Sequence, residues 1–453
     1  MKRLITTMLL TGSVTVNVFA GGLLTNTNQH IRFLRNPARD ASLQIDAVYS
    51  NPAGLSFLAD GWQASFNWQA AFQDRNISTT FAPFAGFGGN ATKEFEGKAK
   101  SLFIPSAFVV YKHDKWAFSG SIAITGGGGK AKYDNGLGSF ESQAAIMPAT
   151  LTTAMQAVNP AFPAITQYSI ESNFTGSQVT VGGQLGASYR ICDNLSTFAG
   201  LRLSYVSNTY EGYLGNLQAN IMGTMQSVRT FLESVNPTFA ALAADRSLDV
   251  EQTGTGIAPL LGVDYKCGKF NIGLKYEFKT DITLENKSAV NTSGITAYDD
   301  GAKTPGDIPA LLTGGVSYAV CDKVTVSAGY HQFFDKDADM AGDKQKALSH
   351  GTSEILAGVE WNVTQKLQLS AGAQRSDYGI RDNYLSDVSF NMDSWSVGFG
   401  FGYDINSHFT VNAGCLLTNY EDYTKTTTVS TLAYTDIYSR TSKAFGIGID
   451  YKF

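Results

Sequence analysis

The chain has 453 residues, of which 43% are hydrophobic, 12% are aromatic and only 16% are charged. Soluble domains carry about 25% charged residues, and a formal net charge of −5 leaves no basic surface of the kind that binds nucleic acid. Beyond residue 20 the sequence contains no run of about 18 apolar residues, which excludes a protein that crosses a membrane with helices.

The first twenty residues predict an export signal. Lys2 and Arg3 form a positive start, residues 4–18 are largely apolar, and Ala20 is a small residue that suits signal peptidase. A buried N-terminal helix is the alternative, but Gly21 and Gly22 follow immediately. We therefore expect residues 1–20 to be a cleaved signal peptide.

Residues 21–60 lack the regular alternation that follows them, and the first clear strand begins near Trp62. If the later strands close into a wide barrel, its lumen leaves a water-filled channel unless something plugs it. We expect residues 21–60 to be a hatch inside the lumen, with a flexible tail as the alternative. The motif Asn51-Pro52-Ala53 lies within this segment.

From residue 61 onward one pattern repeats. Segments of about ten residues alternate between apolar or aromatic residues and small polar ones, most clearly at 270–278, 395–403 and 445–453. In a soluble sandwich the polar face usually carries many Lys and Glu, whereas here it carries mostly Gly, Ser, Thr and Asn. This is the pattern of a membrane barrel with apolar side chains outward and small polar ones in the lumen.

The lengths of the connections give the number of strands. Six tight turns alternate with seven long connections, and an outer-membrane barrel places the turns on the inside and the long loops outside. The predicted fold is therefore all-β: a transmembrane antiparallel barrel of 14 strands over residues 61–453. The long connections lie near residues 73–100, 126–176, 207–252, 279–307, 334–351, 379–391 and 421–441.

Four consecutive glycines interrupt the third predicted strand, which starts near Trp116. Glycine weakens strand pairing and permits positive φ, as a bulge or kink requires. The alternative is that the glycines begin an outer loop. The four residues are Gly126, Gly127, Gly128 and Gly129.

Two long connections carry unusual amounts of apolar residues. Residues 216–244 show the spacing of an amphipathic helix, and residues 144–165 are rich in Ala, Met and Leu. Methionine forms a deformable apolar surface that accepts varied ligands. These loops either cover each other or take up a hydrophobic substrate. The residues proposed for capture are Met147, Met155, Leu217, Ile221, Met222, Met225, Val228 and Leu232.

Alternation places Arg202, Lys275 and Glu277 in the lumen. A lumen cation such as Arg202 or Lys275 could hold a carboxylate head group. The other reading is that these charges pair with one another or with the hatch.

Few residues indicate a disulfide, a metal site or a catalytic site. Cys192, Cys267 and Cys321 lie at tight turns on different hairpins, and Cys415 lies on an apolar face, so we expect four free thiols. No CxxC or HxxxH spacing indicates a metal site. Only His331, near Asp335 and Asp337, resembles an acid–base cluster, and we expect no enzyme and no cofactor.

The export signal, the segment DAVYSNPAGLSFL, the strand count and the aromatic C-terminus together resemble the FadL-type family of outer-membrane transporters for long-chain fatty acids and hydrocarbons. The resemblance implies a hatch that contains Asn51, Pro52 and Ala53. It also implies capture of apolar ligands by outer loops and sideways exit through a gap opened by a kink in the third strand. Asn51–Ala53 and Gly126–Gly129 are then expected to form one gate.

The predicted function is uptake of hydrophobic small molecules across a bacterial outer membrane. The alternatives are a receptor or adhesin that uses the barrel as an anchor, and an open polar porin. The expected partners are the ligand, outer-membrane lipid and the barrel-assembly machinery, with no nucleic acid and a monomeric state. The sequence leaves the identity of the ligand open.

Phe453 yields the first testable prediction, because unbroken alternation from Ile447 ends on this last residue. A terminal aromatic strand is the feature that we expect the assembly machinery to read. Deletion of Phe453 should lower the heat-modifiable barrel fraction on gels of isolated membranes. Assembly at the wild-type level would contradict the role given to this residue.

Overall fold

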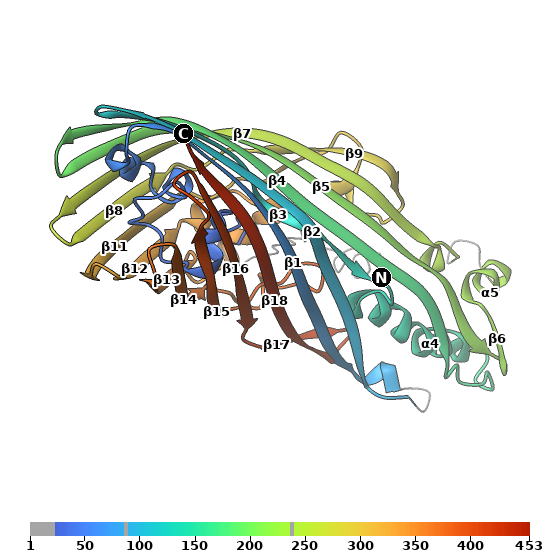
Figure 1. Cartoon of the computed structure of the whole chain (residues 1–453). Coiled ribbons are helices and arrows are strands. Elements are labelled where there is room, and N and C mark those ends of the chain that lie inside the picture. The colour runs from blue at the N-terminus through green and yellow to red at the C-terminus, as the bar shows by residue number, and fades with distance from the viewer. Residues whose placement is uncertain (1–22, 86–88, 236–239) are drawn as a thin grey trace.

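The computed structural model describes residues 23–85, 89–235 and 240–453, and the strands of these residues close into one antiparallel barrel (Figure 1). Closure is made by β18 against β1, from Gln63 opposite Lys452 to Phe81 opposite Tyr434. The predicted 14-stranded barrel is confirmed. The export signal predicted for residues 1–20 lies outside the described residues. Within them, no helix has the length and apolar character needed to span a bilayer.

Fourteen strands of the described chain form the closed wall, each paired with the next in sequence and the last with the first. Four shorter strands extend hairpins: β6 (Thr224–Ser227), β9 (Thr283–Asn291), β10 (Lys303–Pro305) and β17 (Tyr423–Val429). The wall consists of β1 (Gly61–Phe81), β2 (Thr92–His113), β3 (Trp116–Tyr133), β4 (Tyr168–Cys192), β5 (Leu195–Ile221), β7 (Arg246–Cys267), β8 (Phe270–Glu277), β11 (Leu311–Cys321), β12 (Val324–Phe333), β13 (Ser353–Asn362), β14 (Leu367–Asp377), β15 (Ser394–Asp404), β16 (Phe409–Tyr420) and β18 (Leu432–Lys452).

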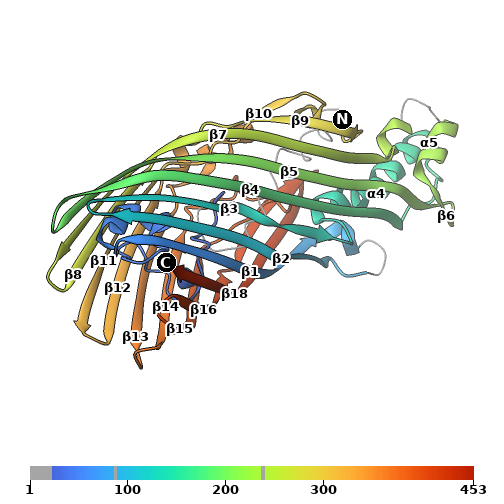
Figure 2. The same ribbon diagram turned by 45° about the horizontal axis from the view of Figure 1, so that its top comes forward.

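The wall has a tall half and a short half, which Figures 1 and 2 show from two directions. The adjacent strands β18, β1 to β5 and β7 have 18 to 27 residues, whereas β8 and β11 to β16 have 8 to 12. The six tight turns are confirmed, and they share one end of the barrel with the start of β1 and the end of β18. Much of the predicted loops at 73–100, 126–176 and 207–252 is strand instead.

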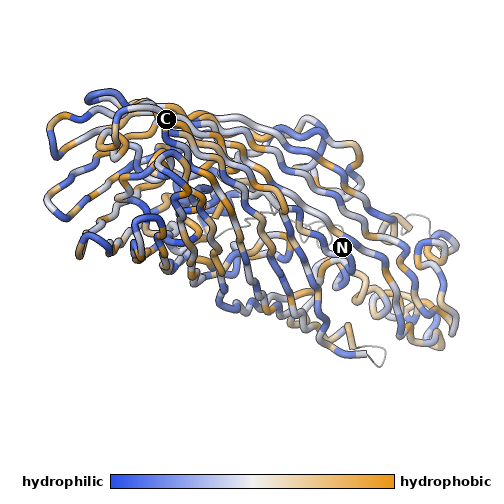
Figure 3. Tube along the Cα trace, viewed as in Figure 1, coloured by the Kyte–Doolittle hydropathy of each residue, from blue (hydrophilic) through white to orange (hydrophobic). Residues whose placement is uncertain are grey.

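The physical reason for that error is visible on β1. Its outward side chains Trp62, Phe66, Trp68 and Phe72 are exposed and apolar, but from Asp74 onward the outward residues are polar. Residues 62 to 72 span roughly 25 Å at about 3.3 Å each with a tilt of about 45°, which matches the apolar band of a membrane barrel. The backbone continues as strand beyond the band, where the apolar signal stops. Figure 3 shows the alternation along the strands.

The N-terminal segment fills the lumen with α2 (Ile31–Arg35), α3 (Ala47–Ser50) and η1 (Pro52–Phe57). Buried ion pairs hold it to the wall. Arg32 and His30 contact Asp450 of β18, at 3.0 and 3.1 Å, and Arg39 contacts Glu360 of β13 at 2.9 Å. A tail loose in solvent would not bury these charges, so the segment is a hatch.

Shorter helices lie in the outer connections. The amphipathic helix predicted from residue 216 is wrong over its first part, because β5 continues to Ile221 and pairs there with β6. Among the described residues of that connection, α5 begins only at Val228. The helices are η2 (Ala82–Ala85), α4 (Gly138–Val158), α5 (Val228–Val235), η3 (Ala241–Ala243), η4 (Thr296–Tyr298), η5 (Asp335–Asp337) and η6 (Ala341–Ala347).

All four cysteines are free thiols, as predicted. Cys192, Cys267 and Cys321 are exposed at tight turns, whereas Cys415 is buried on β16. Its register places it opposite Phe399 on one side and Phe445 on the other. These two aromatic residues cover a thiol on the apolar outer face.

This arrangement predicts two classes of thiol reactivity. In the folded barrel without reductant, a water-soluble maleimide should label Cys192, Cys267 and Cys321 and leave Cys415 unlabelled until denaturant is added. Intact-mass spectrometry counts the adducts under both conditions. Two thiols protected even in denaturant would indicate a disulfide and would contradict this strand order.

Candidate functional site

The wall is interrupted between β2 and β3. The two strands pair from Ser106 opposite Ala123 to the tight turn, and again from Lys100 opposite Lys130 outward. Between these stretches, residues 101–105 of β2 and residues 124–129 of β3 are not paired with one another. The interruption lies inside the apolar band, where an unpaired backbone group has no water to bind.

The local sequence accounts for the interruption on both strands. The pairing of β3 with β4 shifts between Ile124 and Gly126 and again between Gly127 and Gly129, while φ is +62° at Gly127 and +105° at Gly128. On β2, Pro105 has no N–H to donate. Since β3 continues to Tyr133, the glycines kink a strand and do not begin an outer loop.

The glycine at position 127 cannot be replaced without strain. A Cβ there would lie 2.0 Å from the carbonyl oxygen of Gln178 on β4. A valine at this position would not restore a regular strand, because the side chain has no space and φ is positive.

The first described residues of the hatch lie across the interruption. The side-chain nitrogen of Asn26 donates to the carbonyl oxygens of Ile124 and Gly127, at 3.1 and 2.8 Å, and its backbone N–H donates to Thr125 at 2.8 Å. A Cβ on Gly126 would come within 2.7 Å of the Leu24 carbonyl oxygen. Asn26 therefore supplies hydrogen-bond donors to carbonyl groups of β3 in the stretch where β2 does not pair with β3.

The Asn-Pro-Ala motif lies elsewhere. Asn51 donates to the Val263 carbonyl at 3.0 Å, and the Pro52 carbonyl accepts from Ser188 at 2.6 Å. The Ala53 carbonyl accepts from Ser196. These contacts fix the motif to β4, β5 and β7 near the tight turns. The prediction that Asn51–Ala53 and Gly126–Gly129 form one gate was wrong in its hatch partner, since Leu24 and Asn26 contact the glycines.

Two cavities lie on either side of residues 24–28. The inner cavity is lined by residues 25–28, by Thr125 at the kink and by Phe33, among others. The outer cavity is lined by Leu24 and by Val206, which lies further out on β5 than the inner cavity's Arg202. Ile308 lines both. Residues 24–28 therefore separate the outer cavity from the inner cavity, which extends to the kink in β3.

The lumen cations are already paired. Arg202 and Lys275 both contact Glu277, each at 2.5 Å, and Lys275 also donates to the Tyr49 carbonyl at 2.8 Å. The Arg202 guanidinium lies 4.6 Å from the centre of the Tyr49 ring. The inward placement of Arg202 and Lys275 agrees with the sequence, and their partners are a carboxylate of the wall and the hatch.

His331 forms a second paired group in the inner cavity, at the same level as Lys275 and two wall strands from it. Its ring nitrogens lie 2.9 Å from Asp40 and 2.7 Å from Glu354. The proximity to Asp335 and Asp337 suggested by the sequence is not the arrangement found, because Asp335 instead accepts from the backbone N–H of Thr352. The imidazole is held between two carboxylates and ties the hatch to β12 and β13.

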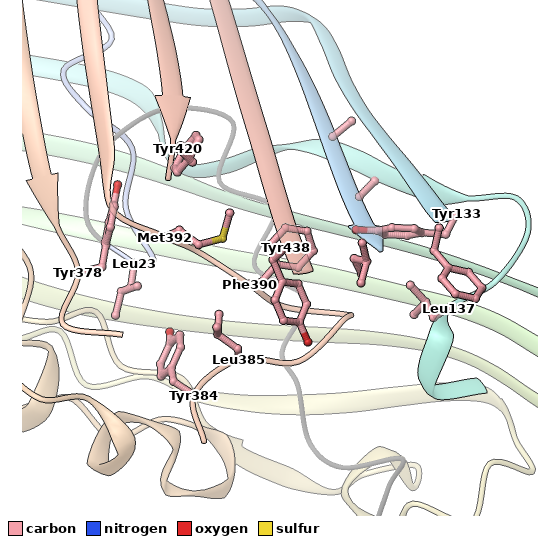
Figure 4. Close-up of a cluster of buried hydrophobic side chains, with 14 of the residues drawn as sticks. Leu23, Tyr133, Leu137, Tyr378, Tyr384, Leu385, Phe390, Met392, Tyr420 and Tyr438 are labelled. Atoms are coloured by element: carbon pink, nitrogen blue, oxygen red, sulfur yellow. The ribbon is translucent and has the colours of Figure 1, made fainter. Parts of the chain in front are cut away.

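A buried aromatic cluster includes Tyr378, Tyr384 and Phe390 from the connection between β14 and β15 (Figure 4), and Tyr384 also lines the outer cavity. We call residues 378–392 the lid. Arg75 of β1 donates to the Phe390 carbonyl at 3.3 Å and lies 4.2 Å from its ring centre. Lys344 of η6 lies 4.2 Å from the Tyr384 ring centre. Burial, with Lys425 and Arg75 nearby, lowers the pKa of Lys344 to about 7. The sequence alternation did not indicate this lid, because it comes from an irregular connection.

The proposed capture residues meet at the end of the tall wall. Ile221, Val228 and Leu232 are buried in one apolar cluster with Leu151 of α4, and Met147, Met155 and Leu217 pack against it. Met222 and Met225 are exposed at the tip. The two connections therefore cover each other over most of their apolar surface.

No protein-family model and no curated protein matches the sequence. Among solved structures, a Pseudomonas aeruginosa FadL homologue has a TM-score of 0.66 at 13% identity, over 96% of this chain and 100% of its own. The Pseudomonas putida toluene transporter TodX gives 0.56 at 17% identity, and the Ralstonia pickettii toluene transporter TbuX gives 0.53 at 15%. Both cover 90% of this chain and 94% of their own. The FadL-type barrel fold predicted from the sequence is confirmed.

The contacts of Asn26 predict a local change in stability. Asn26→Ala removes two side-chain hydrogen bonds of about 1 kcal/mol each, so opening at residues 124–129 should increase roughly tenfold or more. Hydrogen–deuterium exchange measured on peptides from this region tests it. Asn28→Ala is the matched control, because Asn28 bonds only Asp46 and Ser50 of the hatch with its amide nitrogen. Equal exchange in both variants would contradict the role of Asn26.

Proposed function

We propose that this protein is an outer-membrane channel that takes up hydrophobic small molecules and releases them sideways into the membrane. The carrying observation is the unpaired stretch between β2 and β3, covered from inside by Asn26 and adjoining the inner cavity at Thr125. The fold shared with FadL-type and toluene transporters supports the same proposal.

The relative strength of the contacts favours sideways release over release through the hatch. To leave downward, a ligand would require the hatch to break the Arg32–Asp450, Arg39–Glu360 and His331–Asp40 contacts, which are largely buried. Breaking a buried ion pair costs about 3–5 kcal/mol. Moving Asn26 costs three hydrogen bonds of about 1 kcal/mol each.

The chemistry of release points the same way. An apolar ligand gains about 25 cal/mol for each Å² of surface that leaves water, and only the sideways route ends in lipid.

The inner cavity favours an uncharged ligand. Arg202 and Lys275 share Glu277, and His331 lies between two carboxylates. An incoming carboxylate would have to compete with these partners inside a site of low dielectric, whereas an apolar molecule meets Phe33, Phe278 and Leu311 at no such cost. We therefore place hydrocarbons and other neutral hydrophobes ahead of fatty acid anions.

Initial capture is assigned to the end of the tall wall. The cluster between α4 and α5 leaves Met222 and Met225 exposed, and an apolar ligand can bind a deformable methionine surface without polar partners. From there the long strands of the tall half run back toward the short half (Figure 2), and β5 lines the outer cavity with Val206 and Asn208.

The alternatives fit less well. A general porin needs an open polar lumen, but here the hatch occupies it and is held by buried charges. A receptor or adhesin would not require an interrupted wall inside the apolar band. Single-channel recording distinguishes the porin, because the plugged barrel should give no steady conductance.

The sideways route is tested by obstruction from the outside. Leu102 is 53% exposed within the unpaired stretch of β2. In a background with the three turn cysteines changed to serine, Leu102→Cys labelled with a bulky maleimide should reduce cellular uptake of radiolabelled toluene at least fivefold. The label fills the opening without touching the outer loops.

Ile355→Cys is the matched control, since Ile355 is 65% exposed on β13 of the opposite wall. Its labelled form should transport at the unlabelled rate. If both labelled variants keep full uptake, the sideways route is wrong. If both lose it equally, the effect belongs to the label and the opening has no special role.

A further inference from the structure

Lysines gather on the outer face of the tall wall, at the level where the apolar band ends. The strand register places Lys443 of β18 beside Phe72 of β1, then Lys100 of β2 and Lys130 of β3 in one row across the wall. The next row outward holds Lys98 opposite Lys132. All five lysines are exposed. We call Lys98, Lys100, Lys130, Lys132 and Lys443 the lysine patch.

Exposed carboxylates lie on the outward side of the patch, with Asp74 beside Lys98 and Glu96 two residues further out on β2, so positive charge is concentrated in the row of Lys443, Lys100 and Lys130. Lys100 faces Lys130 and Lys98 faces Lys132 directly across the β2–β3 ladder, an arrangement that is destabilising for like charges. Lys132 contacts Asp134, and Lys130 lies 3.8 Å from Glu211, both in exposed pairs.

In the described part of the chain, Lys98, Lys100 and Lys443 form no ion pair, although Asp74 lies beside Lys98 in the register. An external anion would relieve the repulsion between the facing lysines.

Apolar side chains lie directly below the patch. Leu102 and Phe103, 53% and 65% exposed, follow Lys100 on β2 and bulge out of the β1 pairing. The ring nitrogen of Trp68 donates to the Leu102 carbonyl at 2.7 Å, which holds an aromatic ring at the same place. A row of cations above an apolar surface is complementary to a lipid with an anionic head group.

The position of the patch is specific to one side of the barrel. At the same level, β4, β5 and β7 carry Ser177, Thr209 and Glu251 across the register from Lys130. On the short wall, Arg375 is occupied by Asp393 and Glu421. The cations therefore concentrate where Lys100 and Lys130 form the last pair before the interruption.

We propose that the lysine patch binds the phosphate groups of an outer-leaflet lipid, whose acyl chains lie over Leu102 and Phe103 at the interruption between β2 and β3. The proposal rests on the placement of the barrel in an outer membrane. One phosphate between Lys100 and Lys130 bridges the two strands at the outer end of the gap. The bound lipid thus covers the opening from the membrane side, as Asn26 covers it from the lumen.

The test compares lipid binding by the purified full chain. Diphosphoryl lipid A is titrated in detergent, and bound lipid is counted by native mass spectrometry. The variant K98Q/K100Q/K130Q/K132Q should bind at least tenfold more weakly, because one lysine near an anionic lipid contributes roughly fivefold. The control K287Q/K303Q should bind as wild type, since Lys287 faces Glu251 and Lys303 contacts Glu285.

Heat-modifiable migration verifies that each variant is folded. Lipid A stripped of its phosphates should bind wild type as weakly as diphosphoryl lipid A binds the quadruple variant, and inorganic phosphate should not compete at millimolar concentration. Unchanged lipid A binding by the quadruple variant, or equal binding of both lipids, would overturn the proposal. Toluene uptake is measured in parallel, so that loss of lipid binding with intact uptake separates this inference from the proposed function.

Discussion

The structure depends on the rule that backbone N–H and C=O groups inside an apolar layer must be paired. A closed antiparallel barrel satisfies the rule by joining β18 to β1, and thirteen further ladders complete the circle. One long unpaired stretch lies between β2 and β3, where glycines and Pro105 remove regular pairing. Because the carbonyl groups of residues 124, 125 and 127 still need donors, the hatch supplies them through Asn26. The unpaired stretch between β2 and β3 and the hatch residue Asn26 that lies over it therefore depend on each other.

The hatch has two parts that are attached with different strength. Residues 30–46 carry the charges that bind β18, β12 and β13 through Asp450, His331 and Glu360. Residues 24–28 contact the kink by hydrogen bonds of neutral groups. Buried charges left without partners are far more costly than neutral groups, so the first part stays in place under conditions that release the second. The proposed function accordingly requires movement of residues 24–28 alone.

The sequence predicted those features that follow from local pattern. Alternation and turn spacing gave fourteen strands, four glycines marked the kink, and parity placed Arg202 and Lys275 inward. The height of the tall wall was missed because the outward residues beyond the apolar band are polar, as on β1 from Asp74 onward, so the apolar outward alternation stops there. Asn26 was missed because nothing local distinguishes it from other asparagines near residue 30. Its contacts are with carbonyl groups about a hundred residues away, whereas the motif at Asn51 contacts β4, β5 and β7.

Three sets of contacts along the lumen differ in the kind of interaction that forms them: those of the lid, those of Asn26 and the ion pairs of the hatch. The lid is held by contacts such as Arg75 to the carbonyl and ring of Phe390, together with Lys344 on the Tyr384 ring. With a pKa of about 7, Lys344 loses its charge near neutral pH, and its attraction to the ring weakens accordingly. Below the lid, Asn26 closes the passage with neutral hydrogen bonds, and below that the ion pairs of the hatch close it most firmly. By this comparison the neutral hydrogen bonds of Asn26 are the weakest of the three sets, and they lie at the unpaired stretch between β2 and β3. This difference in interaction strength supports the proposal of sideways release, which does not require the hatch to unfold.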